Sequence, residues 1–245
     1  MKKLFAKVFL GLCALGTSTV AFAQDAAAVV EGEGFHQALK TKFIEGSADF
    51  MSTIAIALIL GLAFALERII YLNLADVNTD KLLKGIDDAL ENGDVEGAKA
   101  IARDTRGPIA SIAYQGLMRI DQGIDVVERS VVSYGGVQSG LLEKNLSWIT
   151  LFIAMSPSLG FLGTVVGMVM AFDKIEQVGD ISPTVVAGGM KVALITTIAG
   201  LIVALILQVF YNYLLSKLES ILNKMEDASI TLLDMVVKYE LKYKK

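Results

Sequence analysis

The chain has 245 residues, 54% of them hydrophobic, and a mean hydropathy of +0.57. This composition is too apolar for an ordinary soluble domain and indicates a membrane protein. A net charge of only −4 does not suggest nucleic-acid binding, and one histidine (His36) with one cysteine (Cys13) excludes most metal and disulfide frameworks. Because the sequence has no phosphate loop, nucleophile motif or metal-ligand spacing, we expect neither enzyme activity nor a metal or cofactor.

The N-terminus is typical of a secretory signal peptide. Three lysines precede an apolar stretch, and Ala21-Phe22-Ala23 forms an A-x-A cleavage site before Gln24. An uncleaved first helix is the alternative. Cys13 raises the further alternative of a lipoprotein, although Leu12 is larger than the residue usual at that position.

Three further apolar runs are long enough to cross a bilayer. In the first, Glu67-Arg68 follows a charge-free stretch, and we expect this pair to be an interface anchor with Arg68 snorkelling to the headgroups. Lys191, near the start of the third run, is expected to snorkel outward as well. The predicted order is a signal peptide at 1–23, a periplasmic segment at 24–48, a transmembrane helix at 49–72, a cytoplasmic helical domain at 73–145, a transmembrane helix at 146–172, a periplasmic turn at 173–184, a transmembrane helix at 185–216 and a cytoplasmic helical tail at 217–245.

The distribution of lysine and arginine predicts the orientation. Nine of these residues lie in residues 67–145, from the end of the first apolar run to the start of the second, and six follow the third span, whereas two precede the first span after cleavage and one lies in the turn. Cationic segments stay in the cytoplasm, so we expect the bacterial inner membrane with a periplasmic N-terminus and a cytoplasmic C-terminus.

The two cytoplasmic segments have helical periodicity. Apolar residues share one helix face in each segment, and Gly93-Asp94 and Gly107-Pro108 are expected breaks. If the third span and the tail form one helix, Val185 to Tyr243 is about 90 Å long, and its apolar stripe must pack against neighbouring helices. With no strand signal, the fold class is an all-α membrane protein: three transmembrane helices in the mature chain, with long helices extending into the cytoplasm.

Small residues and a hydroxyl share one face of the second span. Gly163 and Gly167 form a GxxxG pair, which lets helix backbones approach closely in a bilayer. Thr164 either bonds a carbonyl of its own helix or faces an ion path. Pro157 removes a backbone hydrogen bond, and either bends the helix to fit its neighbours or turns Ser156 and Ser158 toward a lumen.

The third span offers matching hydroxyls. Thr197 shares a face with Gly200, while Thr196 lies about 100° away. Thr164 and Thr197 are both expected about 12 to 18 Å below the outer surface, so they can line one polar patch. Neither run carries a carboxylate, which predicts half of an ion channel whose titrating group is on a partner. The candidate ion-pathway residues are Thr164, Thr197 and Thr196, and the candidate helix-packing residues are Gly160, Gly163, Gly167, Gly200 and Pro157.

These motifs resemble the ExbB/TolQ proton-channel family, with flagellar MotA as a distant relative. The resemblance covers about residues 50 to 240. It rests on the runs Leu142-Glu143-Lys144-Asn145-Leu146-Ser147-Trp148, Ser156-Pro157-x-Leu159-Gly160-x-Leu162-Gly163-Thr164-Val165-x-Gly167, Ala193-Leu194-Ile195-Thr196-Thr197-x-Ala199-Gly200-Leu201 and Tyr211-Asn212.

The resemblance implies a homo-oligomeric ring, a pentamer, around the single-span helices of an ExbD-like subunit. That partner carries the membrane aspartate, which the threonines corresponding to Thr164 and Thr197 face. The output passes to a periplasmic TonB-like transducer for import across the outer membrane. A TolQ-like envelope-maintenance motor, a MotA-like motility motor, a sodium-driven motor and a passive oligomeric scaffold remain alternatives.

One position departs from the family pattern. Many members carry a glutamate just before the Ala-Leu-x-x-Thr stretch, where this chain has Val192 beside Lys191. Either that glutamate is dispensable, or Lys191 polarises the entrance of the channel in its place.

Overall fold

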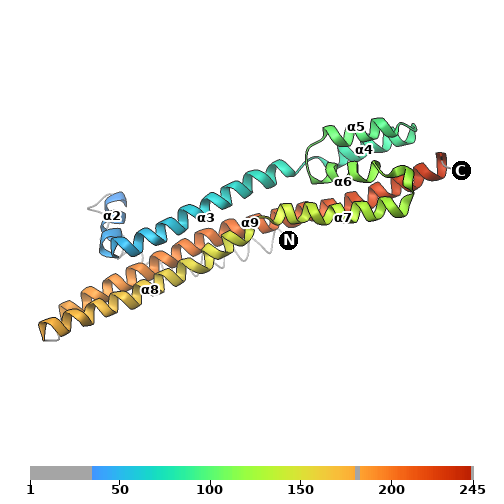
Figure 1. Ribbon diagram of the computed structural model, residues 1–245. Helices are drawn as coiled ribbons and strands as arrows, with labels where there is room; N and C mark the ends of the chain where they lie inside the picture. The colour runs from blue at the N-terminus through green and yellow to red at the C-terminus, as the bar shows by residue number, and fades with distance from the viewer. Residues whose placement is uncertain (1–34, 180–182, 244–245) are drawn as a thin grey trace, which may run out of the picture. The chain divides into compact units, whose positions relative to one another are not determined.

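The computed structural model describes residues 35–179 and 183–243 (Figure 1). The predicted signal peptide lies outside these ranges. The described residues form α-helices and one short 3-10 helix, with no strand among them, which confirms the all-α fold class. Contacts divide the chain into two compact units. Of the described residues, the first unit comprises those up to Thr53 together with those within Leu159–Ala199, and the second comprises Ile54–Ser158 and those from Gly200 onward.

Within the described ranges, three helices are long and apolar enough to cross a membrane. They are α3 (Ala48–Ala75), α8 (Leu146–Val178) and α9 (Pro183–Tyr243), and they contain the predicted spans. The third span and the tail form one unbroken helix of 61 residues, as expected. Gly179, at φ 74°, follows α8 in the left-handed conformation that commonly ends a helix. Pro183 opens α9, where its missing N–H costs no hydrogen bond.

Short helices fill the segment between the first two spans. Their bounds are α4 (Thr79–Glu91), α5 (Val95–Asp104), α6 (Pro108–Leu117), the 3-10 helix η1 (Ile120–Gln122) and α7 (Ile124–Glu143). The predicted breaks are confirmed. Gly93 has φ 77°, Asp94 caps α5 by accepting a hydrogen bond from the Gly97 N–H, and Gly107 at φ 114° precedes Pro108.

The helices of the second unit share one hydrophobic core. The predicted apolar stripe of the tail is buried in it, and Leu218, Ile221 and Leu232 are each at most 4% exposed. Gly116 shows how tightly α6 packs, because a Cβ there would lie 2.9 Å from Val131 and 3.2 Å from Leu232. The C-terminal half of α9 therefore packs against α4 to α7 of its own chain.

Arg68 does not snorkel to the headgroups as expected. It is only 3% exposed, and its Nη1 donates long hydrogen bonds of 3.4 Å to the carbonyls of Leu141 and Leu142. These carbonyls end α7, where unpaired acceptors and the helix dipole favour a cation. Arg68 Nη2 also pairs with Glu67 at 2.8 Å, and Glu67 accepts a hydrogen bond from Asn145 at 3.0 Å. The pair thus joins α3 to the α7–α8 junction.

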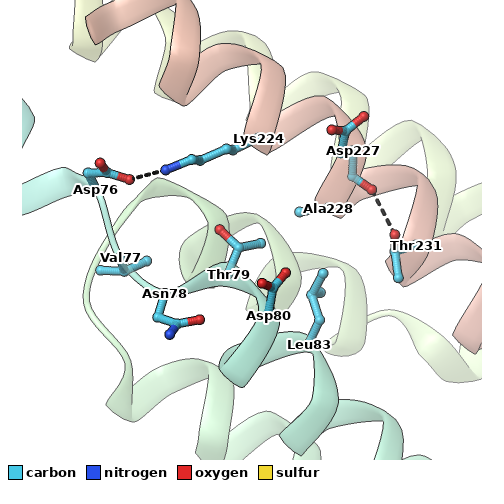
Figure 2. A pocket seen from close by; sticks show the side chains of 10 residues that line it. All are labelled: Asp76, Val77, Asn78, Thr79, Asp80, Leu83, Lys224, Asp227, Ala228 and Thr231. Carbon is cyan, nitrogen blue, oxygen red and sulfur yellow. Dashed lines mark hydrogen bonds and ion pairs between the residues drawn. The ribbon is translucent and has the colours of Figure 1, made fainter.

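Asp76, directly after α3, joins that helix to α9. Its two carboxylate oxygens accept hydrogen bonds from Lys217 at 2.5 Å and Lys224 at 2.6 Å. Figure 2 shows the Lys224 pair at the edge of a cleft of about 520 Å³. The lysine hydrogen bonds hold the pKa of Asp76 below its usual value of 3.8, so the carboxylate stays ionised in this site.

We expect D76N to lower the stability of the protein at neutral pH. Because the pKa is lower in the folded state, the stabilisation is present above the unfolded-state pKa and is lost as the pH falls through the folded-state pKa. The loss is about 1 kcal/mol, or roughly 2 to 4 °C in Tm. Thermal unfolding of the purified protein at pH 7 and pH 3 measures it.

The difference between D76N and the unmodified protein should shrink at pH 3, because the unfolded-state carboxyl is then largely protonated and the stabilisation by the lowered pKa is partly lost. Asp80 lines the same cleft but forms no ion pair within the described part of the chain, so D80N is the matched control. An equal loss in D76N and D80N would contradict the role given to the two lysines.

Candidate functional site

Within the first unit, α8 and α9 approach each other closely at three glycines of α8. A Cβ at Gly160 would lie 2.9 Å from the Thr196 carbonyl oxygen, and one at Gly163 would lie 2.6 Å from the Thr196 hydroxyl. A Cβ at Gly167 would lie 3.1 Å from the backbone nitrogen of Ala193. Only glycine allows these approaches without displacement, which is the packing predicted for the GxxxG pair.

The close approach brings two threonine hydroxyls together. The Oγ1 atoms of Thr164 on α8 and Thr197 on α9 are hydrogen-bonded to each other. Thr164 Oγ1 also donates to the Ala193 carbonyl at 3.1 Å, and Thr197 Oγ1 contacts the Gly160 carbonyl at 3.2 Å. Both side chains are partly buried. The predicted juxtaposition is therefore confirmed, whereas a role in ion movement stays a prediction.

Thr196 lies differently from the other two threonines. Its side chain is fully buried, and its hydroxyl donates to the carbonyls of Ala193 at 2.8 Å and Val192 at 3.2 Å, both in its own helix. The side chain fills the space above Gly163. These contacts favour a packing role for Thr196, and its predicted place in the ion pathway is left without a supporting contact among the described residues.

The cluster is polar but carries no group that titrates near neutral pH. Each threonine hydroxyl can donate one hydrogen bond and accept others, so the pair can bind either a carboxylate or a carboxylic acid. No aspartate, glutamate or histidine occurs in residues 159–172 or 192–199. The arrangement can therefore solvate a titrating group from another chain but cannot itself take up a proton.

Pro157 and the serines beside it belong to the second unit. Pro157 lies inside α8 without ending the helix. The buried Ser156 hydroxyl donates to the Phe152 carbonyl at 2.7 Å, and the exposed Ser158 hydroxyl donates to the Ala154 carbonyl at 3.0 Å. Both serines thus bond their own helix rather than a second polar group. Gly200, also in the second unit, is buried, in keeping with a packing role.

Lys191 forms an ion pair that the sequence did not predict. Its Nζ lies 2.6 Å from Oε1 of Glu45, the last residue of α2 (Phe35–Glu45), a helix that the sequence patterns did not predict. Hydrogen bonds from Lys191 and from Lys42 keep the pKa of Glu45 below its usual value of 4.5. Because Lys191 and Thr197 are six residues apart, they project about 120° from each other on α9. Lys191 therefore projects away from the threonine pair.

The position without the family glutamate borders an open space. Val192 lines a cavity of about 290 Å³ between the end of α8 and the start of α9, together with Lys174, Gly188 and Gly189. The described residues place no carboxylate in this lining. Among the residues that the structure describes, no acidic side chain in this lining takes the place of the glutamate.

This geometry defines a class of protein: an all-helical membrane protein in which two spans meet through threonine hydroxyls. The sequence pattern of the MotA/TolQ/ExbB proton channel family matches residues 104–227, about half of the chain. The chain belongs to this family, which confirms the resemblance seen in its motifs. The match includes both threonines and the three close-contact glycines.

Three relatives are named for biopolymer transport. A protein of Methanothermobacter thermautotrophicus, named as a homologue of the biopolymer transport protein ExbB, is 30% identical over 69% of this chain and 60% of its own. Biopolymer transport protein exbB1 of Vibrio cholerae is 37% identical over 33% of this chain and 39% of its own. Biopolymer transport protein ExbB of Aquifex aeolicus is 36% identical over 31% of this chain and 51% of its own. The chain thus spans about 40 to 60% of the length of these relatives.

We expect G163A to destabilise the contact between α8 and α9. The added methyl group overlaps Thr196 and must displace it, at a cost of about 1 to 3 kcal/mol. Thermal unfolding of purified protein measures the loss. T196G opens the same space, so the effect of G163A should be smaller when both substitutions are combined.

G188A is the matched control, because no atom lies within 4 Å of a Cβ at Gly188. It should be neutral or slightly stabilising. Equal losses in G163A and G188A, or no coupling between G163A and T196G, would contradict the close-contact assignment.

Proposed function

We propose that this chain is the ring-forming subunit of a proton-driven inner-membrane motor of the ExbB type. Five copies surround the single-span helices of an ExbD-like partner, whose membrane aspartate takes the proton. The motor passes its motion to a periplasmic TonB-like transducer for import across the outer membrane. The N-terminus is periplasmic and the C-terminus cytoplasmic, with domain boundaries as predicted from the sequence.

The observation that carries this proposal is the hydrogen-bonded pair Thr164 and Thr197, which joins two largely apolar spans. A partner carboxylate in a membrane needs hydrogen-bond donors, and its protonated form needs an acceptor. A hydroxyl supplies both by rotating, so the pair can accompany a carboxyl group through a cycle of protonation. The family membership supports the same reading.

Glu45 and Lys191 do not belong to this step in our proposal. They neutralise each other at the outer end of α9, and Lys191 projects away from the threonines. Of the two explanations for Val192, we therefore favour the one in which the family glutamate is dispensable. The ion path then depends on hydroxyls from this chain and on a carboxylate from the partner.

Other outputs of the same family remain candidates. A TolQ-like motor would support envelope maintenance, and a MotA-like motor would support motility. Threonine hydroxyls can also ligate sodium, and activity measured with and without sodium separates the two ions. A passive scaffold would keep its function after collapse of the proton gradient, whereas the proposed motor would lose it.

We expect T164V and T197V each to stop energy transfer while leaving the ring assembled. Valine keeps the shape of threonine but removes the hydroxyl, so the partner carboxyl loses a hydrogen bond in a place without water. Gradient-dependent import in cells should fall at least about tenfold, equivalent to 1.4 kcal/mol or more. Native mass spectrometry of the purified complex follows assembly.

Serine variants are the matched controls, because T164S and T197S keep the hydroxyl. They should retain most of the import activity. Full activity in both valine variants would remove the hydroxyls from the ion path, and disassembly of the ring in both would reduce them to packing residues.

A further inference from the structure

The second unit carries an open groove on α6 and α7. It has a volume of about 400 Å³, and its lining includes Val126, Tyr134, Val137, Arg119 and Arg129. Arg119 is engaged within the chain, where it donates to Ser130 at 2.9 Å. Arg129 is exposed and forms no ion pair with any residue that the structure describes. The groove therefore combines apolar side chains with an unpaired cation.

An exposed ridge runs along α9 in the same unit. It consists of five residues spaced alternately three and four apart, which places them on one side of the helix: Asp227, Ile230, Asp234, Val237 and Leu241. Ile230 is 56% exposed and Leu241 is 69% exposed. Neither aspartate forms an ion pair with a described residue; Asp227 also borders the cleft of Figure 2. The ridge has the apolar character of the groove and the opposite charge.

We propose that the groove of one copy of this chain takes the α9 ridge of the next copy, with Arg129 facing Asp234. The inference rests on the proposed ring, for which it names the cytoplasmic contact between subunits. Two different surfaces meet, so the contact is heterologous, and repetition around an axis closes a ring. The charges favour a contact between groove and ridge, because a contact between the grooves of two copies would place Arg129 against Arg129.

The depths of the two surfaces agree. In a ring about an axis along the membrane normal, residues in contact must lie at similar distances from the membrane. Arg129 lies 17 residues before Leu146, where the sequence predicts that span two begins, and Asp234 lies 18 residues after Ser216, where it predicts that span three ends. At about 1.5 Å per helical residue these positions are about 26 and 27 Å from the predicted membrane edges, with the first stretch interrupted by the break at Lys144 and Asn145.

Glycines on α7 leave room for a neighbouring helix beside the groove. Gly136 and Gly140 lie three and seven residues beyond Ser133, about one and two helical turns, and apart from the adjoining backbone no described atom lies within 4 Å of a Cβ at either position. There is therefore open space for a Cβ at both positions within the described part of the subunit. G136L should leave the subunit folded while it obstructs the close approach of another copy.

Charge exchange tests the proposal in the full-length protein. We expect R129E and D234R each to raise the dissociation constant of the subunit contact about threefold to tenfold. The combined variant R129E/D234R should restore it. Native mass spectrometry and dilution-dependent dissociation measure assembly. R106E and D88R change exposed charges elsewhere in the unit and are the controls.

Cysteine cross-linking tests the geometry in a C13A background. R129C and D234C should each give little cross-linking alone, whereas co-expression of the two should give a disulfide-linked dimer. Failure of both charge restoration and mixed cross-linking in an assembled complex would overturn this contact and leave the proposed ring intact. If the unmodified protein is monomeric, the proposed ring is wrong. If R129E or D234R lowers activity without lowering assembly, the groove binds another partner and the proposal is contradicted.

Discussion

The candidate site depends on the close approach of α8 and α9 in the first unit. Without side chains at Gly160, Gly163 and Gly167, the two backbones come near enough for the Thr164 and Thr197 hydroxyls to bond each other. In lipid, where apolar surfaces gain little by meeting each other, such contacts between small residues are a main source of helix association. The same feature that packs the helices thus places two hydroxyls side by side in an apolar segment.

The second unit is stabilised in a different way. Its core is a conventional set of buried apolar side chains from α4 to α7 and the C-terminal half of α9. Charged contacts join α3 to this core at two places: Arg68 contacts the end of α7, and Asp76, directly after α3, pairs with two lysines of α9. The long helix α9 therefore carries residues of the threonine site and, further along the chain, residues that depend on ion pairs and a hydrophobic core.

Much of this was predictable because the signals are local. Hydropathy identified the three spans, glycine and proline identified the breaks at Gly93 and Gly107, and helical spacing with depth placed Thr164 beside Thr197. Contacts between distant segments were not predictable in this way. The burial of Arg68 depends on α7 ending beside it, and the Lys191–Glu45 pair depends on the helix α2. The sequence also could not separate Thr196 from Thr197. The two adjacent threonines have the same chemistry, and only the packing of α8 against α9 buries one of them.

Proton flux into lipid vesicles tests most directly the central claim, that this chain supplies hydroxyls but no titrating group to a proton path. Vesicles would hold this chain alone, the single-span partner alone, or both, and an imposed pH gradient would drive the flux. The account predicts flux only when both chains are present, and its loss when the partner's membrane aspartate becomes asparagine. Proton uptake by vesicles that hold this chain alone would contradict it.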